Sequence, residues 1–316
     1  NGVLRNISRK KETISYPKKD KNFVTYLSVT YSIPEWIIKF FMKTYDDETV
    51  EKIIESYLED KKTTLCCLMS KGGKDVIRKE LEEENVTVED GELIENAVKI
   101  SDYDFLYRLR AFREGKCYVQ DESSMLCAKL AGAKEGQFVM DLCSAPGGKS
   151  LYTADQMKGS GQVLSRDLTE YKTDLIEDNI ERMGFTNMEV EVFDATILDE
   201  EHIEAADVVI ADVPCSGLGI MGKKNDIKYH ISEDGMKDLV KLQREILTNA
   251  VQYVKHGGTL IYSTCTINPE ENEKNMQWII NNFDYEAVDI TEELPKNLKI
   301  ETAKDGYIQL LPGVHS

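Results

Sequence analysis

The sequence predicts an α/β fold with a mainly parallel sheet, preceded by a small α+β subdomain and a helical linker. Two observations indicate this fold. From Phe138 onward, short apolar runs alternate with loops and helical stretches, which is typical of a parallel sheet with helices on both faces. The polar and glycine-containing motifs of this half all follow the apolar runs, at the strand ends where such sheets bind ligands.

The composition indicates a folded protein with a strongly negative charge. Of the 316 residues, 41% are hydrophobic, and the formal net charge is −18. No apolar run approaches the roughly 18 residues of a membrane span, and the polar, basic start lacks the apolar core of a secretory signal. Seven cysteines without a CxxC pair favour a reducing compartment over disulfides or zinc. We therefore expect a cytoplasmic monomer with no membrane partner and no metal.

Residues 1–60 are expected to form a basic arm and a helical linker. Between Asn1 and Lys21 the chain has seven Lys or Arg residues and only two acidic residues. Such an arm can contact nucleic-acid phosphates with a salt-sensitive affinity, or it can be a solvated linker. The stretch from Ile33 to Lys43 has an apolar stripe at helical spacing, which predicts an amphipathic helix packed against a core.

Residues 61–118 are expected to form the small α+β subdomain. Thr63–Met69 predicts a strand, Asp75–Glu84 a helix and Asn85–Glu89 a second short strand. The segment DFLYRLRAFREGKCYVQDESS then leads into residues 119–316, the expected parallel-sheet domain.

Five buried strands and one long helix are the clearest elements of residues 119–316. The strands are expected at FVMDLC, QVLSRD, MEVEVF, DVVIADV and TLIYST. The helix is expected from Asp234 to Val254, because apolar residues recur there every three or four positions.

The first of these strands ends in DLCSAPGGKS, residues 141–150, which predicts a tight turn into a helix that begins near Lys149. Glycines there let backbone amides approach a ligand, and a helix N-terminus favours negative charge. A phosphate-loop motif needs a glycine where this chain has Cys143, which disfavours a nucleoside triphosphate. A turn that only starts a helix is the simpler alternative.

Two aspartates follow the next two strands. Asp167 stands where a carboxylate commonly accepts hydrogen bonds from ribose hydroxyls, although a helix-capping role is an alternative. Asp194 stands where it could accept from an adenine amino group, or it is only a loop residue. Together with the glycine turn, these acids predict a cofactor that carries adenosine without a triphosphate.

Two cysteines follow the last two strands. Cys215 lies in DVPCSG and Cys265 in STCTIN, and Asp212 ends the strand before Cys215, where it could hold a base ring. A thiolate is the reactive form of cysteine, and a cation such as Lys149 could increase its fraction. A lone cysteine at a strand end is usually a core residue. Two in distinctive loops beside a cofactor site instead favour attack on a planar carbon, such as that of cytosine.

The motifs DLCSAPGGKS, DVPCSGLG and YSTCTINPEENE together resemble the signatures of the RNA 5-methylcytosine methyltransferases. The order of these motifs resembles that in the bacterial members that act on small-subunit ribosomal RNA. Two further segments, FREGKCYVQDESS and LVKLQREILTNAV, also resemble those members. NGVLRNI resembles the last helix of the NusB-like domain found in those members. The resemblance covers nearly the whole chain.

The resemblance implies a class I S-adenosylmethionine-dependent methyltransferase with a Rossmann-like sheet, preceded by an RNA-binding subdomain. It implies methyl transfer from S-adenosylmethionine to carbon 5 of a cytidine in 16S ribosomal RNA. Cys265 would attack carbon 6, and Cys215 would assist proton removal or release of the adduct. Extrusion of the target base from its stack fits such chemistry.

The resemblance also implies the residues of the cofactor site. They are Cys143, Ser144, Ala145, Pro146, Gly147, Gly148 and Lys149 at the methionine part, Asp167 at the ribose, Asp194 at the adenine, and Asp212 at the target base near the methyl donor. Lys149 and Asp212 are expected to serve the chemistry as well.

Three other functions remain open. The substrate could be transfer RNA or another RNA, the substrate could be DNA, or the chain could be an RNA-binding assembly factor without activity. The second cysteine argues against a DNA enzyme, in which the cysteine of the PC motif is the nucleophile. The presence of both cysteines argues against a pure scaffold, which needs neither.

Overall fold

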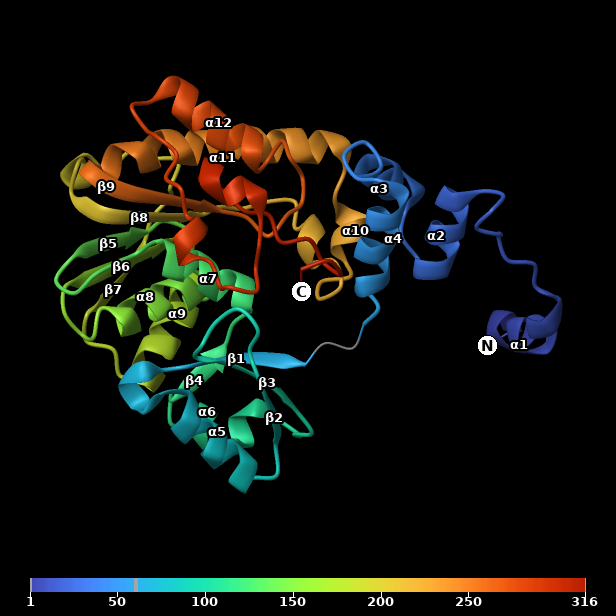
Figure 1. Cartoon of the computed structure of the whole chain (residues 1–316), viewed down its shortest axis with the longest axis horizontal. Coiled ribbons are helices and arrows are strands. Elements are labelled where there is room, and N and C mark those ends of the chain that lie inside the picture. Colours follow the sequence, from blue (N-terminus) through green and yellow to red (C-terminus); the bar gives the residue numbers. More distant parts are fainter. Residues whose placement is uncertain (1, 60–61, 316) are drawn as a thin grey trace. The chain divides into compact units, whose positions relative to one another are not determined.

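The computed structural model describes residues 2–59 and 62–315, and the chain divides into two compact units. Unit 1 comprises Asn1–Asp60, Leu218–Ile231 and Leu310–Ser316, and unit 2 comprises Lys61–Gly217 and Ser232–Gln309. Figure 1 shows the elements of both units along the chain. The domain boundary expected between residues 60 and 61 lies outside the described residues, and the one between residues 118 and 119 stays a prediction.

Unit 1 is helical in its described part. Its helices are α1 (Gly2–Lys10), α2 (Phe23–Tyr31), α3 (Glu35–Phe41), α4 (Asp47–Ser56) and α10 (Ile227–His230). The amphipathic helix expected from Ile33 to Lys43 is confirmed as α3, which buries Ile37, Ile38 and Phe41. By contrast, α1 buries none of its side chains.

Unit 2 contains two sheets. The smaller one is antiparallel, with the strand order β2-β3-β1-β4. Its elements are β1 (Thr63–Cys67), α5 (Gly73–Glu83), β2 (Thr87–Asp90), β3 (Ala97–Ser101), α6 (Arg110–Arg113) and β4 (Cys117–Val119). The sequence predicted β1, α5 and β2 but not β3 or β4, which are defined by their antiparallel pairing with β1.

The larger sheet has the strand order β7-β6-β5-β8-β9, and every neighbouring pair is parallel. Its strands are β5 (Phe138–Asp141), β6 (Gln162–Asp167), β7 (Met188–Val192), β8 (Ala206–Asp212) and β9 (Val254–Ser263). Its helices are α7 (Glu122–Leu130), α8 (Gly148–Gln156), α9 (Glu170–Met183), α11 (Glu233–Tyr253) and α12 (Glu273–Asn282). The predicted parallel sheet and all five of its strands are confirmed.

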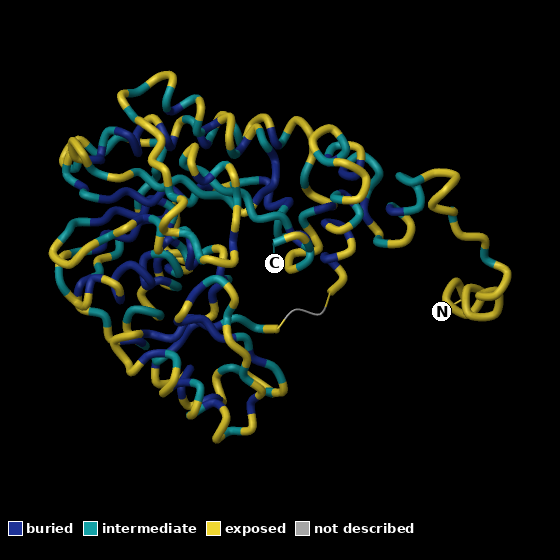
Figure 2. Tube along the Cα trace, viewed as in Figure 1, coloured by how far each residue is buried: buried dark blue, intermediate teal, exposed yellow. Residues whose placement is uncertain are grey.

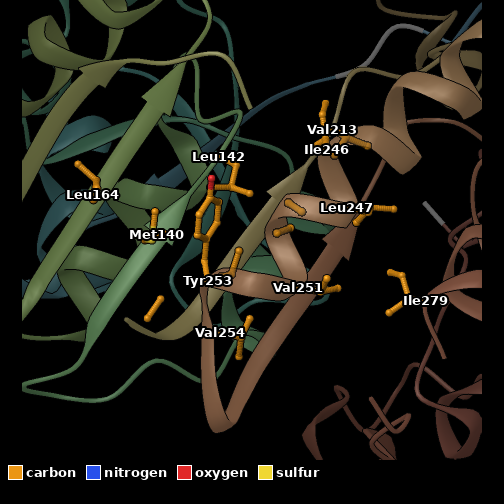
Figure 3. Packing of buried hydrophobic residues seen from close by; sticks show 14 residues of the cluster. Met140, Leu142, Leu164, Val213, Ile246, Leu247, Val251, Tyr253, Val254 and Ile279 are labelled. Carbon is orange, nitrogen blue, oxygen red and sulfur yellow. The ribbon is translucent and has the colours of Figure 1, made fainter. Parts of the chain in front are cut away.

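The larger sheet is buried on both faces. Figure 1 shows α8 and α9 on one face and α11 and α12 on the other. Val139 and Val208 pack with Ala154 of α8, whereas the next residues, Met140 and Val209, pack on the α11 side. Because side chains alternate along a strand, near-continuous apolar runs are what a sheet covered on both faces requires. Figures 2 and 3 show these buried strands and the core on the α11 side.

The strand order places a topological switch point between β5 and β8. Helix α8, which follows β5, packs on one face of the sheet. Helix α11, which leads from β8 to β9, packs on the other face. In open parallel sheets, ligands bind beyond the carboxyl ends of the strands at such a point. The loops after β5 and β8 are therefore where the fold best accommodates a ligand. Among the described residues, no helix has both the length and the apolar character to cross a membrane.

Candidate active site

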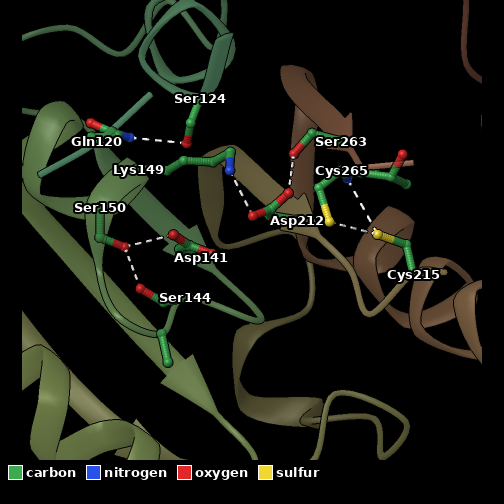
Figure 4. Close-up of polar contacts among 12 residues, drawn as sticks. Gln120, Ser124, Asp141, Ser144, Lys149, Ser150, Asp212, Cys215, Ser263 and Cys265 are labelled. Atoms are coloured by element: carbon green, nitrogen blue, oxygen red, sulfur yellow. Dashed lines mark hydrogen bonds and ion pairs between the residues drawn. The ribbon is translucent and has the colours of Figure 1, made fainter. Parts of the chain in front are cut away.

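The predicted site residues lie at the carboxyl ends of the strands in the larger sheet. The glycine turn follows β5, Asp167 ends β6, Asp194 follows β7, Asp212 ends β8 and Cys265 follows β9. Parallel strands present these ends at one edge of the sheet. Direct contacts join Lys149 to Asp212 and Cys215 to Cys265, as Figure 4 shows.

The turn between β5 and α8 depends on its two glycines. Gly147 has a φ of +100°, a left-handed conformation that glycine adopts without a Cβ penalty. A Cβ on Gly147 would lie 3.2 Å from Ile176, and one on Gly148 would lie 3.1 Å from the side-chain nitrogen of Gln120. Helix α8 begins at Gly148, one residue before the predicted start. The turn thus brings unsubstituted backbone to the N-terminus of α8, where negative charge is favoured.

A buried carboxyl lies at the start of this turn, and no feature of the sequence marks it as a site residue. Asp141 is 1% exposed, and its Oδ2 accepts a hydrogen bond from the Ser150 hydroxyl at 2.7 Å. Ser150 also contacts the Ser144 hydroxyl at 2.8 Å. Among the described residues, Asp141 Oδ1 has no hydrogen-bond partner. Burial raises the pKa of Asp141 to about 6, against the opposing effect of Ser150.

Asp167 connects β6 to the glycine turn. Its Oδ2 accepts from the Ala145 amide at 2.9 Å, and its Oδ1 accepts from the Leu168 amide at 2.7 Å and from Lys172 at 2.8 Å. A carboxylate offers about four acceptor sites, so room remains on Oδ2 for a further donor such as a ribose hydroxyl. Thr169, not Asp167, occupies the capping position of α9, so the helix-capping alternative is wrong.

Asp194 forms a turn of its own beyond β7. Its Oδ1 accepts from the amide and from the hydroxyl of Thr196, at 2.9 Å and 2.7 Å. These hydrogen bonds lower the pKa of Asp194 and keep the group ionised. β7 pairs with β6, so the two aspartates stand on neighbouring strand ends. The assignment of Asp167 to the ribose and Asp194 to the adenine stays a prediction.

Lys149 and Asp212 form an ion pair across the switch point. The Lys149 amine lies 2.6 Å from Asp212 Oδ2, and the Ser263 hydroxyl donates to Asp212 Oδ1 at 2.7 Å. Burial opposes the charge on Lys149, but Asp212 more than compensates, so the pKa of Lys149 is raised. The amine contacts this carboxylate at 2.6 Å, and an effect of Lys149 on the thiolate fraction of a cysteine stays a prediction. Lys149 therefore fixes the orientation of Asp212, whose side chain remains 35% exposed.

The two cysteines of the PC and TC motifs meet. Their sulfur atoms lie 3.1 Å apart, well beyond the roughly 2.0 Å of a disulfide bond. The Cys265 amide also donates to the Cys215 sulfur at 3.2 Å. Cys265 is exposed and Cys215 is half-buried. The contact with the Cys265 sulfur, together with burial, raises the pKa of the Cys215 thiol.

This arrangement can supply a thiol nucleophile beside a second, neutral thiol. The exposed sulfur of Cys265 is accessible to a substrate. The half-buried thiol of Cys215 can donate a hydrogen bond to that sulfur. Within residues 2–59 and 62–315, no group of three or more His, Cys, Asp or Glu residues is arranged to hold a metal ion.

Comparison with known proteins gives a consistent result. The family model described as 16S rRNA methyltransferase RsmB/F matches residues 128–316. The chain is 36% identical, over 99% of its own length and 70% of the other protein, to the probable ribosomal RNA small subunit methyltransferase B of Bacillus subtilis (strain 168).

Many solved structures are similar to this one. The crystal structure of PH0851 superposes with a TM-score of 0.85 at 29% identity, covering 96% of this chain and 68% of the other. The crystal structure of NSun6 from Pyrococcus horikoshii with SFG superposes with a TM-score of 0.73, covering 79% of this chain and 88% of the other. At 19% identity, the second likeness concerns the fold alone.

Proposed function

Because the chain belongs to the RsmB/F family of 16S rRNA methyltransferases, we propose that it methylates carbon 5 of a cytidine in small-subunit ribosomal RNA through a covalent cysteine adduct. Membership makes the chain a ribosomal RNA methyltransferase with the class I fold and S-adenosylmethionine as cofactor. The carbon that is methylated and the roles of individual residues are the proposal.

The observation that carries the proposal is the meeting of Cys215 and Cys265 at 3.1 Å, on loops that follow adjacent parallel strands. Carbon 5 of cytosine is a poor nucleophile until a group adds to carbon 6. A thiol is suited to that addition, and it must also be released afterwards. Two sulfurs with different surroundings provide for both steps.

The residues beyond β5 and β6 fit the cofactor. The turn Cys143–Lys149 presents unsubstituted backbone at Gly147 and Gly148, and Asp167 retains acceptor capacity for a hydroxyl. Asp194 offers an ionised carboxylate one strand further along. Bound at these residues, S-adenosylmethionine would supply an electrophilic methyl group.

Cys265 would attack as a thiolate, after its thiol proton has passed to solvent. Its sulfur forms a bond to carbon 6, and the electron pair of the double bond shifts to carbon 5. Carbon 5 would accept the methyl group that the bound cofactor supplies, and the proton of carbon 5 would then pass to solvent. The carbon–sulfur bond breaks as the double bond re-forms, and Cys265 leaves as a thiolate. Cys215, a neutral thiol with a raised pKa, donates a hydrogen bond to that thiolate across 3.1 Å and so assists release.

Asp212 is assigned to the target base. Lys149 and Ser263 each occupy one of its oxygens, which fixes the plane of the carboxylate. Each oxygen keeps acceptor capacity for an amino group such as that on carbon 4 of cytosine. The carboxylate would hold the ring while Cys265 attacks.

Bisulfite sequencing after reaction tests the proposal. The purified protein with S-adenosylmethionine should protect one cytidine of unmodified 16S ribosomal RNA from conversion. Cys265→Ser should lower the rate by about 10³-fold or more, because a hydroxyl is a far weaker nucleophile, and cofactor binding should persist. Methylation at a base position other than carbon 5, or a fully active Cys265→Ser protein, would contradict it. Transfer RNA in a parallel reaction tests the alternative substrate.

A further inference from the structure

We propose that Glu271 is a positioning residue that holds the loops of Cys215 and Cys265 together, so that the two sulfurs face each other. This inference rests on the proposed function for its catalytic consequence, but its geometric part stands without it. Glu271 lies in the segment INPEENE that follows Cys265, and it is fully buried at 0% exposure.

The carboxylate of Glu271 is surrounded by hydrogen-bond donors. Its Oε2 accepts from the Ser216 amide at 2.8 Å and from the Gln243 side-chain amide at 2.9 Å. Its Oε1 accepts from the Ser216 hydroxyl at 2.5 Å and from the Asn268 side-chain amide at 2.8 Å. A buried charge is stable only when its lone pairs are occupied in this way.

These hydrogen bonds reach the residue beside each cysteine. Ser216 directly follows Cys215 and donates its hydroxyl proton to Glu271. The Thr266 hydroxyl lies 2.7 Å from the Ser216 oxygen, and Thr266 directly follows Cys265. Because the single proton of Ser216 goes to the carboxylate, Thr266 is the donor in that contact. One carboxylate therefore links both cysteine loops through two hydroxyl groups.

A second layer holds Glu271 in turn. Gln243 of α11 also donates to the Pro214 carbonyl at 2.9 Å, one residue before Cys215. Asn275 of α12 donates to the Gln243 oxygen at 2.9 Å and to the Tyr262 hydroxyl at 3.1 Å. Gln243 and Asn275 are fully buried, and the network joins α11, α12 and β9 behind the two thiols. The loops are thus fixed by the protein interior.

A carboxylate is required at this position because every neighbour that touches its two oxygens is a donor. An amide in its place would present an NH2 group to two of those donors and leave them without an acceptor. The loops that carry Cys215 and Cys265 would then separate, and their two sulfur atoms would lose the 3.1 Å contact. Displacement of reacting atoms by about 1 Å from a remote change costs about 100-fold in rate.

The test compares Glu271→Gln with Glu270→Gln. Glu270 is the exposed neighbour that pairs with Lys274, so its substitution removes the same charge outside the network. In Glu271→Gln we expect kcat to fall about 100-fold, while the dissociation constant for S-adenosylmethionine and the KM for RNA stay unchanged. Glu270→Gln should match the unmodified protein. Full activity of Glu271→Gln would overturn the proposal, as would a loss of cofactor binding in parallel with activity.

A readout without RNA separates the geometry from the chemistry. Diamide oxidises two nearby thiols to a disulfide, and mass spectrometry of the digested protein identifies the Cys215–Cys265 link. This link should form at least about tenfold more slowly in Glu271→Gln than in Glu270→Gln, because effective concentration falls with misalignment. Equal rates would overturn the positioning role. A slower link in a protein that does not methylate cytidine would support the positioning role and reject the proposed function.

Ser216→Ala provides a milder variant if Glu271→Gln folds poorly. It removes only the hydroxyl that bridges Glu271 and Thr266, and it should slow both methylation and disulfide formation about tenfold. The double variant should be no slower than Glu271→Gln, because both changes break one linkage. Additive losses would contradict the linkage.

Discussion

Cys215 and Cys265 have the same side chain, and their surroundings make them different. The sulfur of Cys265 is exposed and accessible to a substrate. The half-buried sulfur of Cys215 accepts a hydrogen bond from the Cys265 amide. The sequence predicted both residues from their place after strands. It could not show that the sulfurs touch, because that contact depends on β8 and β9 being neighbours.

The same limit applies to other side chains of the site. The sequence does not reveal the ion pair of Lys149 with Asp212, because that contact depends on β5 lying beside β8. Glu271 is one of three glutamates in PEENE, and nothing in the sequence marks it as the buried one. Only the packed structure separates it from the exposed Glu270.

Asp141 makes stability depend on pH. Its pKa is raised to about 6 by burial, so the folded state holds the proton more tightly than the unfolded chain does. The resulting stabilisation is complete below the ordinary carboxyl pKa of about 4 and is lost as the pH rises through 6.

Asp141→Asn should remove this contribution. Between pH 5 and pH 7, the free energy of unfolding of the unmodified protein should fall by about 1 kcal/mol relative to Asp141→Asn. Urea unfolding of both proteins at several pH values measures the difference. Parallel curves for the two proteins would show that the carboxyl titrates normally.

At the scale of elements, the turn between β5 and α8 determines the shape of the proposed cofactor site. The sequence predicted this turn well, because proline restricts φ and glycine permits a positive φ, and both are typical of turns. The five strands were equally clear from their apolar runs. The small antiparallel sheet was only partly predicted, since β3 and β4 are recognised by pairing with β1 and not by their own pattern.

Gly147→Ala should damage this turn. The residue has a φ of +100°, and the new Cβ would lie 3.2 Å from Ile176. We expect a loss of about 1–2 kcal/mol in stability together with weaker cofactor binding. Gly159→Ala is the matched control, because its φ is +74° but no atom lies within 4 Å of the new Cβ.

Calorimetric titration of S-adenosylmethionine and thermal unfolding distinguish the two glycines. Gly159→Ala should lose stability and keep its cofactor affinity. An unchanged affinity in Gly147→Ala would mean that the turn does not contact the cofactor.

At the scale of the whole molecule, the charge distribution is uneven. The chain carries a net charge of −18, yet its first 21 residues are basic. Arg9, Lys10 and Lys11 are all exposed, and α1 buries no side chain. The fold class could be predicted from the alternation of apolar runs and helical stretches, and the family from the motifs DLCSAPGGKS, DVPCSGLG and YSTCTINPEENE. The monomeric state and the RNA contacts of this arm stay predictions.

Replacing Arg9, Lys10 and Lys11 with Gln should weaken RNA binding in a salt-dependent way. If each contacts a phosphate, the slope of log affinity against log salt should become less steep by about 1 per residue. Lys19→Gln is the control, because Lys19 already pairs with Glu51 at 2.5 Å. Filter binding at several salt concentrations gives the slopes. Identical slopes would mean that the arm is a solvated linker.

The division of labour between the two thiols is most directly tested by Cys215→Ala with 16S ribosomal RNA and S-adenosylmethionine. Without the thiol that assists release, the methylated base should remain bonded to the protein as a complex that survives denaturation. Digestion and mass spectrometry should place the bond on Cys265. A bond on another residue, or the absence of any complex in a protein that binds the cofactor, would contradict the assignment of Cys265 as nucleophile and Cys215 as release group.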